Sequence, residues 1–140
     1  MRGQAPAVQQ HTALELLDPS GGHALLSATL RFDPVSDPSA VTAAFELGSE
    51  EVVWTFARDL LVEGLREPAG DGDVHIWPAE DEDGHAVVAI ELNSPDGSAL
   101  LQVSRDDVHR FLAETLRSVP LGTESDHLDV DGLVRALLSA

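Results

Sequence analysis

Six histidines are the residues in this sequence whose chemistry is most readily used, as metal ligands or as acid–base groups near neutral pH. They are His11, His23, His75, His85, His109 and His127. No two of them lie three or four residues apart on one predicted helix, so the helical zinc motif is absent. A site assembled from distant strands stays open, but the spacing favours surface or ordinary polar histidines. We therefore predict no metal site.

Carboxylates are abundant, and one acidic run resembles a calcium-binding loop. The run "EDEDG" spans Glu80–Gly84, and an EF-hand loop places acids before a central glycine. If Gly84 took that place, Ala79 and Ile90 would stand at the first and last ligand positions, where carboxylates are required. We predict a solvated hairpin turn at this run instead.

Sequence motifs for catalysis or phosphate binding do not occur in the chain. It contains neither a nucleophile elbow, nor a P-loop, nor a dinucleotide-binding fingerprint. The run "GDGD" at 70–73 follows a predicted helix and precedes a strand, which reverses the order that phosphate binding needs. Serine, histidine and aspartate are all present, but nothing in the sequence places them together. We predict no catalytic residues, no bound cofactor and no enzymatic activity.

The charged pair Arg58 and Asp59 stands inside "VVWTFARDLLVEGL", where a strand-like alternation passes into a helical one. Adjacent helical residues do not face each other, so the two side chains should not act as one catalytic pair. Asp59 falls in the first helical turn, where a carboxylate interacts favourably with the helix dipole. Arg105 and Asp106 also follow a predicted strand and open a helix, which suggests an internal repeat of two halves. We interpret both pairs as features of the fold.

The elements that must position these residues are predicted from hydrophobic periodicity. A period of two predicts strands at about 11–17, 25–32, 41–47, 52–56, 73–78, 85–92 and 98–103. A period near 3.6 predicts one helix after 56, a second that Ser104 caps and Pro120 ends, and a short C-terminal helix at 130–140. The inner stripe of the first helix is Ala57, Leu60, Leu61, Gly64 and Leu65. Runs of strands followed by helices predict an α+β fold with an antiparallel, strand-rich sheet.

The two tryptophans are the candidates for partner anchors, because tryptophan is favoured in interface hot spots. Trp54 shares a predicted strand face with Val52 and Phe56, so we predict that it packs in the core. Trp77 shares a face with His75 and stands before Pro78 at a strand end. For Trp77, burial and exposure to a partner stay equally open.

Length and charge limit the remaining possibilities. The chain of 140 residues is most simply one domain, which we predict over 11–140 after a flexible segment at 1–10. It has 25 acidic against 8 basic residues and a formal net charge of -17, so nucleic acid and anionic membranes are poor partners. It has no cysteine, no signal-peptide pattern and no apolar run near the roughly 18 residues of a membrane span. We expect a cytoplasmic protein that is not inserted in a membrane.

An ordered series of motifs resembles the SsgA-like sporulation and cell division proteins of spore-forming actinobacteria. The series is "FDPVSDPSAVTAAF", "EEVVWTFARDLLVEGL", "GDGDVHIWP", "VVAIELNSPDGSALL" and "FLAETLRSVPLGTESDHLDVD", and it covers the chain from about Leu25 to its C-terminus. The residues that carry the signature are Trp54, Phe56, Arg58, Asp59, Leu60, Leu61, Gly64, Leu65, Gly72, Asp73, Trp77, Pro78, Ser94, Pro95 and Gly97. We expect their roles to be mainly structural.

The resemblance implies a non-enzymatic protein of sporulation-specific septum placement. The SsgB-like branch of the family is understood to recruit the tubulin-like GTPase FtsZ to future septum sites. The family is associated with a homotrimer and with a fold similar to that of the Whirly-type nucleic-acid-binding proteins. An alternative, single-stranded nucleic-acid binding, follows from that fold analogy alone, and eight arginines with no lysine are little material for a basic groove.

Overall fold

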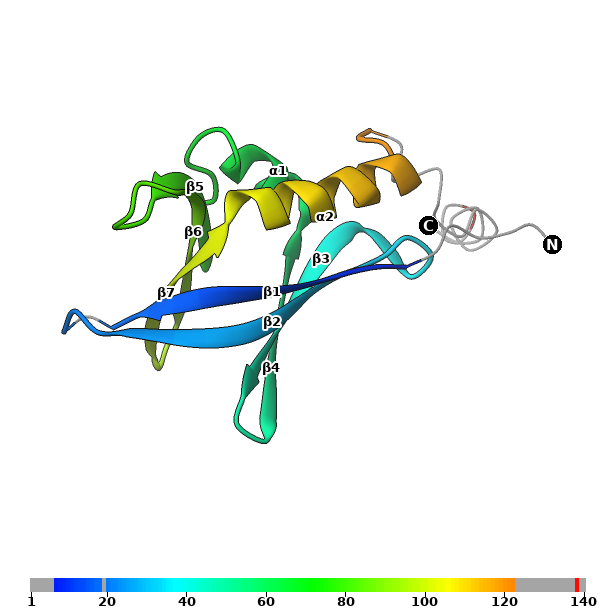
Figure 1. The fold of residues 1–140 in the computed structure, drawn as a ribbon. Coiled ribbons are helices and arrows are strands. Elements are labelled where there is room, and N and C mark those ends of the chain that lie inside the picture. The colour runs from blue at the N-terminus through cyan, green and yellow to red at the C-terminus, as the bar shows by residue number, and fades with distance from the viewer. Residues whose placement is uncertain (1–6, 19, 123–137, 139–140) are drawn as a thin grey trace.

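One antiparallel sheet and two helices make up the described part of the protein, which in this computed structural model is residues 7–18, 20–122 and 138 (Figure 1). The strands are β1 (Val8–Leu17), β2 (His23–Asp33), β3 (Asp37–Leu47), β4 (Glu50–Ala57), β5 (Val74–Glu80), β6 (Ala86–Ser94) and β7 (Gly97–Ser104). The helices are α1 (Arg58–Gly64) and α2 (Arg105–Ser118). The strand order is β4-β3-β2-β1-β7-β6-β5, with every neighbouring pair antiparallel. The predicted antiparallel α+β fold is confirmed.

Three predicted boundaries need correction. Strand β1 begins at Val8, which pairs with Phe32, so residues 8–10 belong to the sheet and not to a flexible segment. The break between β2 and β3 is only 34–36, because the Asp33 carboxylate accepts the N–H groups of residues 35 and 36 and closes the turn. Helix α1 begins at Arg58, and the side chain of Ala57 is exposed. The predicted C-terminal helix lies outside the described residues, apart from residue 138.

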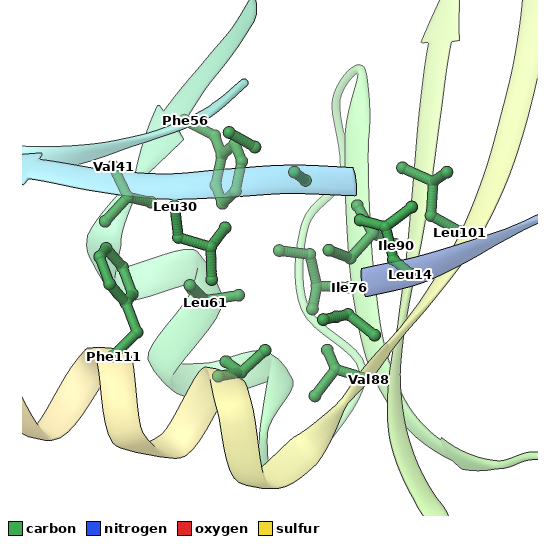
Figure 2. Close-up of a cluster of buried hydrophobic side chains, with 14 of the residues drawn as sticks. Leu14, Leu30, Val41, Phe56, Leu61, Ile76, Val88, Ile90, Leu101 and Phe111 are labelled. Carbon is green, nitrogen blue, oxygen red and sulfur yellow. The ribbon is translucent and has the colours of Figure 1, made fainter. Parts of the chain in front are cut away.

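Both helices cover the same face of the sheet. Helix α2 packs on β1, β6 and β7, whereas α1 packs on β3, β4 and β5. Figure 2 shows Phe111 from α2 and Leu61 from α1 pointing toward Leu30 and Val41 of the sheet, all of them buried. The two runs of strands therefore share one core.

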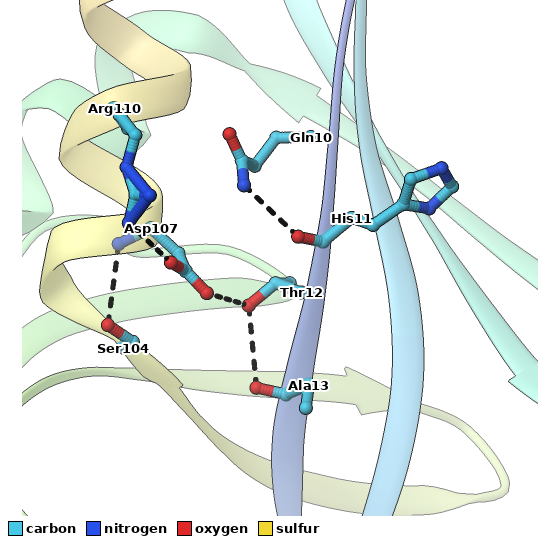
Figure 3. A network of polar contacts seen from close by, with 7 residues as sticks. All are labelled: Gln10, His11, Thr12, Ala13, Ser104, Asp107 and Arg110. Atoms are coloured by element: carbon cyan, nitrogen blue, oxygen red, sulfur yellow. Dashed lines mark hydrogen bonds and ion pairs between the residues drawn. The ribbon is translucent and has the colours of Figure 1, made fainter.

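Polar contacts fix the start of α2 on β1 (Figure 3). Ser104 is the predicted N-cap, and its hydroxyl accepts the Asp107 N–H at 3.4 Å. The Asp107 carboxylate accepts a hydrogen bond from the Thr12 hydroxyl of β1 at 2.6 Å and another from Arg110 at 2.8 Å. The carboxylate thus joins the first turn of the helix to the middle of the sheet.

Candidate functional site

An apolar groove of about 130 Å³ opens on the sheet face that carries the helices. All of its lining residues come from strands, and they are Leu16, Leu26, Phe45, Leu47, Val52, Trp54, Leu92, Ala99 and Leu101. Several of them pack against the main hydrophobic cluster, so the groove continues the core where no helix lies over the sheet. An exposed apolar surface of this kind is typical of a binding site.

Strand β4 forms one wall of the groove and one edge of the sheet. Trp54 packs against the core but stays partly exposed, so the prediction of a core tryptophan is only partly confirmed. Val52 lines the groove and is 36% exposed, while Val53 points to the opposite face and is 50% exposed. Two neighbouring valines on one edge strand therefore face solvent on both sides of the sheet.

Arg58 is the signature residue whose position the sequence does not predict. Its side chain is 0% exposed, and its guanidinium lies 5.1 Å from the centre of the Phe32 ring. One amino group donates a hydrogen bond of 3.0 Å to the carbonyl oxygen of Thr115, in the last turn of α2. A cation beside the carbonyls of a helix C-terminus is favourable, so Arg58 holds the start of α1 against the end of α2.

The predicted internal repeat treats Arg58 and Arg105 as equivalent positions, and the two match in their order along the chain but not in burial. Both arginines follow a strand and open a helix. Arg105 is half-buried, however, while Arg58 is fully enclosed, and Asp59 and Asp106 are both exposed. The buried side of α1 thus consists of Arg58, Leu61 and Gly64, and does not include Ala57 as predicted.

The other signature residues divide between the core and surface turns. Phe56 and Leu61 are buried in the main cluster, and Gly64 is buried against Ile76 of β5. Leu60 and Leu65 are half-buried against the cluster. The exposed members lie in the loop before β5, on β5 and in the β6–β7 turn, namely Gly72, Asp73, Pro78, Ser94, Pro95 and Gly97. Their proposed role as a family signature stays a prediction.

The opposite edge of the sheet, β5, is closed to further strands. Ala69 and Ile76 exchange backbone hydrogen bonds of 2.8 and 2.9 Å on this edge. Pro78 also lies in β5 and has no N–H to donate. Trp77, whose burial the sequence leaves open, is half-buried here.

Histidine–carboxylate pairs are the main electrostatic contacts on the sheet surface. Nδ1 of His23 lies 2.8 Å from a Glu15 carboxylate oxygen, and its Nε2 lies 3.6 Å from Glu82. The hydrogen bond to Glu15 raises the pKa of His23. A similar pair, at 3.0 Å, joins His75 to Glu91, and its hydrogen bond lowers the pKa of Glu91.

We expect an NMR titration to find the pKa of His23 above that of an exposed histidine, with Glu15→Gln lowering it toward the ordinary value. Because the folded chain favours protonated His23, its contribution to stability is present at low pH and lost as pH rises through the raised pKa. Glu82→Gln is the control and should move the pKa less, since Glu82 is more exposed and farther away. An unchanged pKa in Glu15→Gln would contradict the assignment.

The turn between β5 and β6 gathers three side chains that could bind a metal. Ligand atoms of Asp81, Asp83 and His85 lie within 4.8 Å of one another. One Asp81 oxygen already accepts the N–H groups of Asp83 and His85, each at 2.9 Å. These hydrogen bonds lower the pKa of Asp81, and the bond from the His85 N–H has the largest effect. The contacts are those that close a hairpin turn, as the sequence predicts for this run.

Four of the six arginines in the described ranges are ion-paired or buried. Arg31, Arg110 and Arg117 each form an ion pair with a carboxylate, and Arg58 is buried. Single-stranded nucleic acid requires a positively charged track with stacking aromatics. The described surface therefore gives the nucleic-acid alternative no support.

Among the helices in the described ranges, none combines the length and the apolar character that crossing a membrane requires.

The chain is similar to known proteins in sequence and in structure. Residues 26–124 match the family model described as Streptomyces sporulation and cell division protein, SsgA. The sporulation-specific cell division protein SsgB of Frankia casuarinae is 44% identical over 133 residues, which are 94% of this chain and 92% of that protein. SsgB of Streptomyces coelicolor is 50% identical over 105 residues, which cover 74% and 75% of the two chains.

Two solved structures are similar over nearly their whole length. One belongs to work on SsgB mutations that correlate with longitudinal cell division during sporulation of Streptomyces coelicolor; it has a TM-score of 0.84, 41% identity, and coverage of 91% of this chain and 99% of that one. The other is an SsgA-like sporulation-specific cell division protein from Thermobifida fusca, with a TM-score of 0.84, 35% identity, and coverage of 97% and 98%.

Proposed function

Because this chain belongs to the SsgA-like family of sporulation and cell division proteins, we propose that it positions the division septum during sporulation by recruiting FtsZ. The observation that carries the proposal is its similarity to relatives named SsgB along most of the chain. The groove beside β4 supports a binding role, since it offers apolar side chains and no reactive group. The protein would act without chemistry of its own, as a septum-site binding module.

The same proposal includes self-assembly and location. We expect a homo-oligomer, with a trimer favoured, concentrated at the division septum. Membership of the SsgA-like family, which is associated with a homotrimer, is what supports this. The proposal also includes a Whirly-like fold and an internal repeat of two halves. The passage from a strand into a helix at both Arg58 and Arg105 supports the repeat.

Co-sedimentation with FtsZ tests the recruitment step. Purified protein should pellet with FtsZ polymers assembled with GTP and should remain in the supernatant when GTP is omitted. Protein that stays soluble in both cases, and that leaves polymer mass unchanged, would rule out direct recruitment. In sporulating cells, a fluorescent fusion should mark septum sites before FtsZ arrives, whereas a diffuse or nucleoid signal would count against the proposed function.

A further inference from the structure

The two edges of the sheet differ in how they are protected. Natural sheets block exposed edges with proline, lysine, bulges or covering segments. Edge β5 has such protection, namely Pro78 and the bridge from Ala69 to Ile76. Edge β4 has no proline, its charged residues are confined to Glu50 and Glu51 at its start, and its register with β3 runs unbroken from Ala57 to Glu50. Among the described strands, β4 pairs with β3 alone, so its outer edge can accept another strand.

The free edge of β4 is continuous with the apolar groove. Val52 and Trp54 belong to both, and Phe45 and Leu47 extend the lining on the neighbouring strand. Side chains of a strand alternate between the two faces of a sheet. A segment paired to β4 would therefore place every second side chain over Val52 and Trp54, at the mouth of the groove.

Charge indicates what kind of segment fits this place. The end of the β3–β4 hairpin carries exposed Glu46, Glu50 and Glu51. Within the described ranges, Glu51 alone of the three forms an ion pair, with Arg31 at 3.3 Å. A second copy of this chain, with a formal net charge of -17 over its whole length, would bring the same glutamates to this edge. Like charges across an interface disfavour association, whereas opposite charges steer it. The edge therefore favours a basic partner over another copy of itself.

We propose that the free edge of β4 binds an extended, basic segment of a partner protein as an added strand, with its alternate apolar side chains in the groove. Main-chain hydrogen bonds would supply affinity, and the groove and the three glutamates would supply selectivity, as in other cases of strand addition. The inference deepens the proposed function and rests on it for the partner's identity, since it names the surface that would take a septum-site protein.

Fluorescence of Trp54 provides a direct test. The variant Trp77→Phe leaves Trp54 as the single tryptophan, located in the groove wall. The probe is a blocked octapeptide of alternating valine and lysine, matched to the eight residues of β4. We expect a saturable blue shift of the Trp54 emission, because a bound valine excludes water from the indole.

Two altered peptides separate strand addition from unspecific binding. Replacing lysine by glutamate should weaken binding at least about tenfold, since the peptide then meets like charge. Methylating the backbone nitrogens that face β4 should abolish the shift, because the main-chain bonds are lost. Equal binding of all three peptides, or no saturable shift with the first, would overturn the proposal.

Val52→Lys and Val53→Lys form a matched pair of variants in the same background. Both replace an exposed valine of β4, so their cost to folding should be similar and can be checked by thermal unfolding. Val52→Lys places a charge at the mouth of the groove and should weaken the valine–lysine peptide at least about tenfold. Val53→Lys lies on the far face, beside the peptide's lysines, so exposed charge repulsion alone should weaken binding by at most about fivefold. Equal loss in both variants would overturn the assignment to the groove.

FtsZ and sedimentation then separate the two proposals. Peptide binding without FtsZ co-sedimentation would sustain the strand site and remove the proposed function. If both variants bind FtsZ equally and the peptide does not bind, the proposed function stands and the strand site at β4 is wrong. If analytical ultracentrifugation shows an oligomer that Val52→Lys alone dissociates, the edge is covered by a second copy and the inference is wrong.

Discussion

Gly64→Ala is expected to lower the free energy of unfolding by about 2–4 kcal/mol, although alanine is intrinsically the better helix former by about 1 kcal/mol. A Cβ on Gly64 would lie 2.3 Å from Cγ2 and 2.7 Å from Cβ of Ile76. Ile76 is 0% exposed, pairs with Ile90 and is bridged to Ala69, so it has no room to withdraw. Helix α1 could relieve the overlap only by moving away from β5.

Urea unfolding of the variants measures this effect, and Gly72→Ala is the matched control. A Cβ on Gly72 would meet nothing within 4 Å, so that substitution should change stability by less than about 0.5 kcal/mol. In a double-mutant cycle, Ile76→Ala should cost less in the presence of Gly64→Ala than alone, with a coupling of about 1 kcal/mol or more. A stability equal to or above that of the parent in Gly64→Ala would show that helix propensity outweighs the close contact.

Periodicity predicts most of the fold because the sheet face under the helices carries most of the apolar core. In β2 the alternating residues Ala28, Leu30 and Phe32 are buried on this face, and Leu26 before them is half-buried. The alternation cannot show where a turn closes, however. The break at 34–36 is short because the Asp33 carboxylate bonds to the next backbone N–H groups, which is a side-chain contact and not a pattern.

Hydrophobic periodicity cannot predict the groove, because it does not show which part of a sheet face the helices cover. Leu26 and Leu47 follow the same alternation as residues of the core, yet Leu47 is 41% exposed. The lengths of the strands and helices are the feature that indicates an uncovered part of the face. A strand of 11 residues spans roughly 36 Å, whereas the seven-residue helix α1 covers only about 10 Å. A short helix on long strands leaves part of the apolar sheet face uncovered, and the groove opens in that part.

The burial of Arg58 cannot be predicted from the sequence, for a different reason. The i, i+3, i+4 pattern assigns apolar residues to the inner face, so Ala57 was placed inside and the arginine outside. The structure reverses this, because the chain leaves β4 in an extended conformation at Ala57 and the helix starts one residue later. Only the tertiary contacts with Phe32 and Thr115 show that a charged side chain belongs in the core.

Arg58→Ala is expected to lower the free energy of unfolding by about 3–5 kcal/mol. The change removes a buried hydrogen bond to the Thr115 carbonyl and a cation above the Phe32 ring, and it leaves a cavity where the long side chain lay. Arg58→Lys should recover part of the loss, since it keeps the charge but not the planar guanidinium. Chemical denaturation of both variants gives the comparison.

Arg105→Ala is the control, because Arg105 opens α2 as Arg58 opens α1 but is half-buried. It should change stability by less than about 0.5 kcal/mol. Equal losses of stability at the two positions would mean that the buried contacts of Arg58 do not stabilise the fold more than the contacts of the half-buried Arg105.

Arg58 also directly follows β4. Hydrogen exchange in Arg58→Ala should therefore quicken in α1 and in the last residues of β4, since the anchor that ends this strand is gone. Unchanged exchange there would show that α1 and β4 are held by their apolar contacts alone.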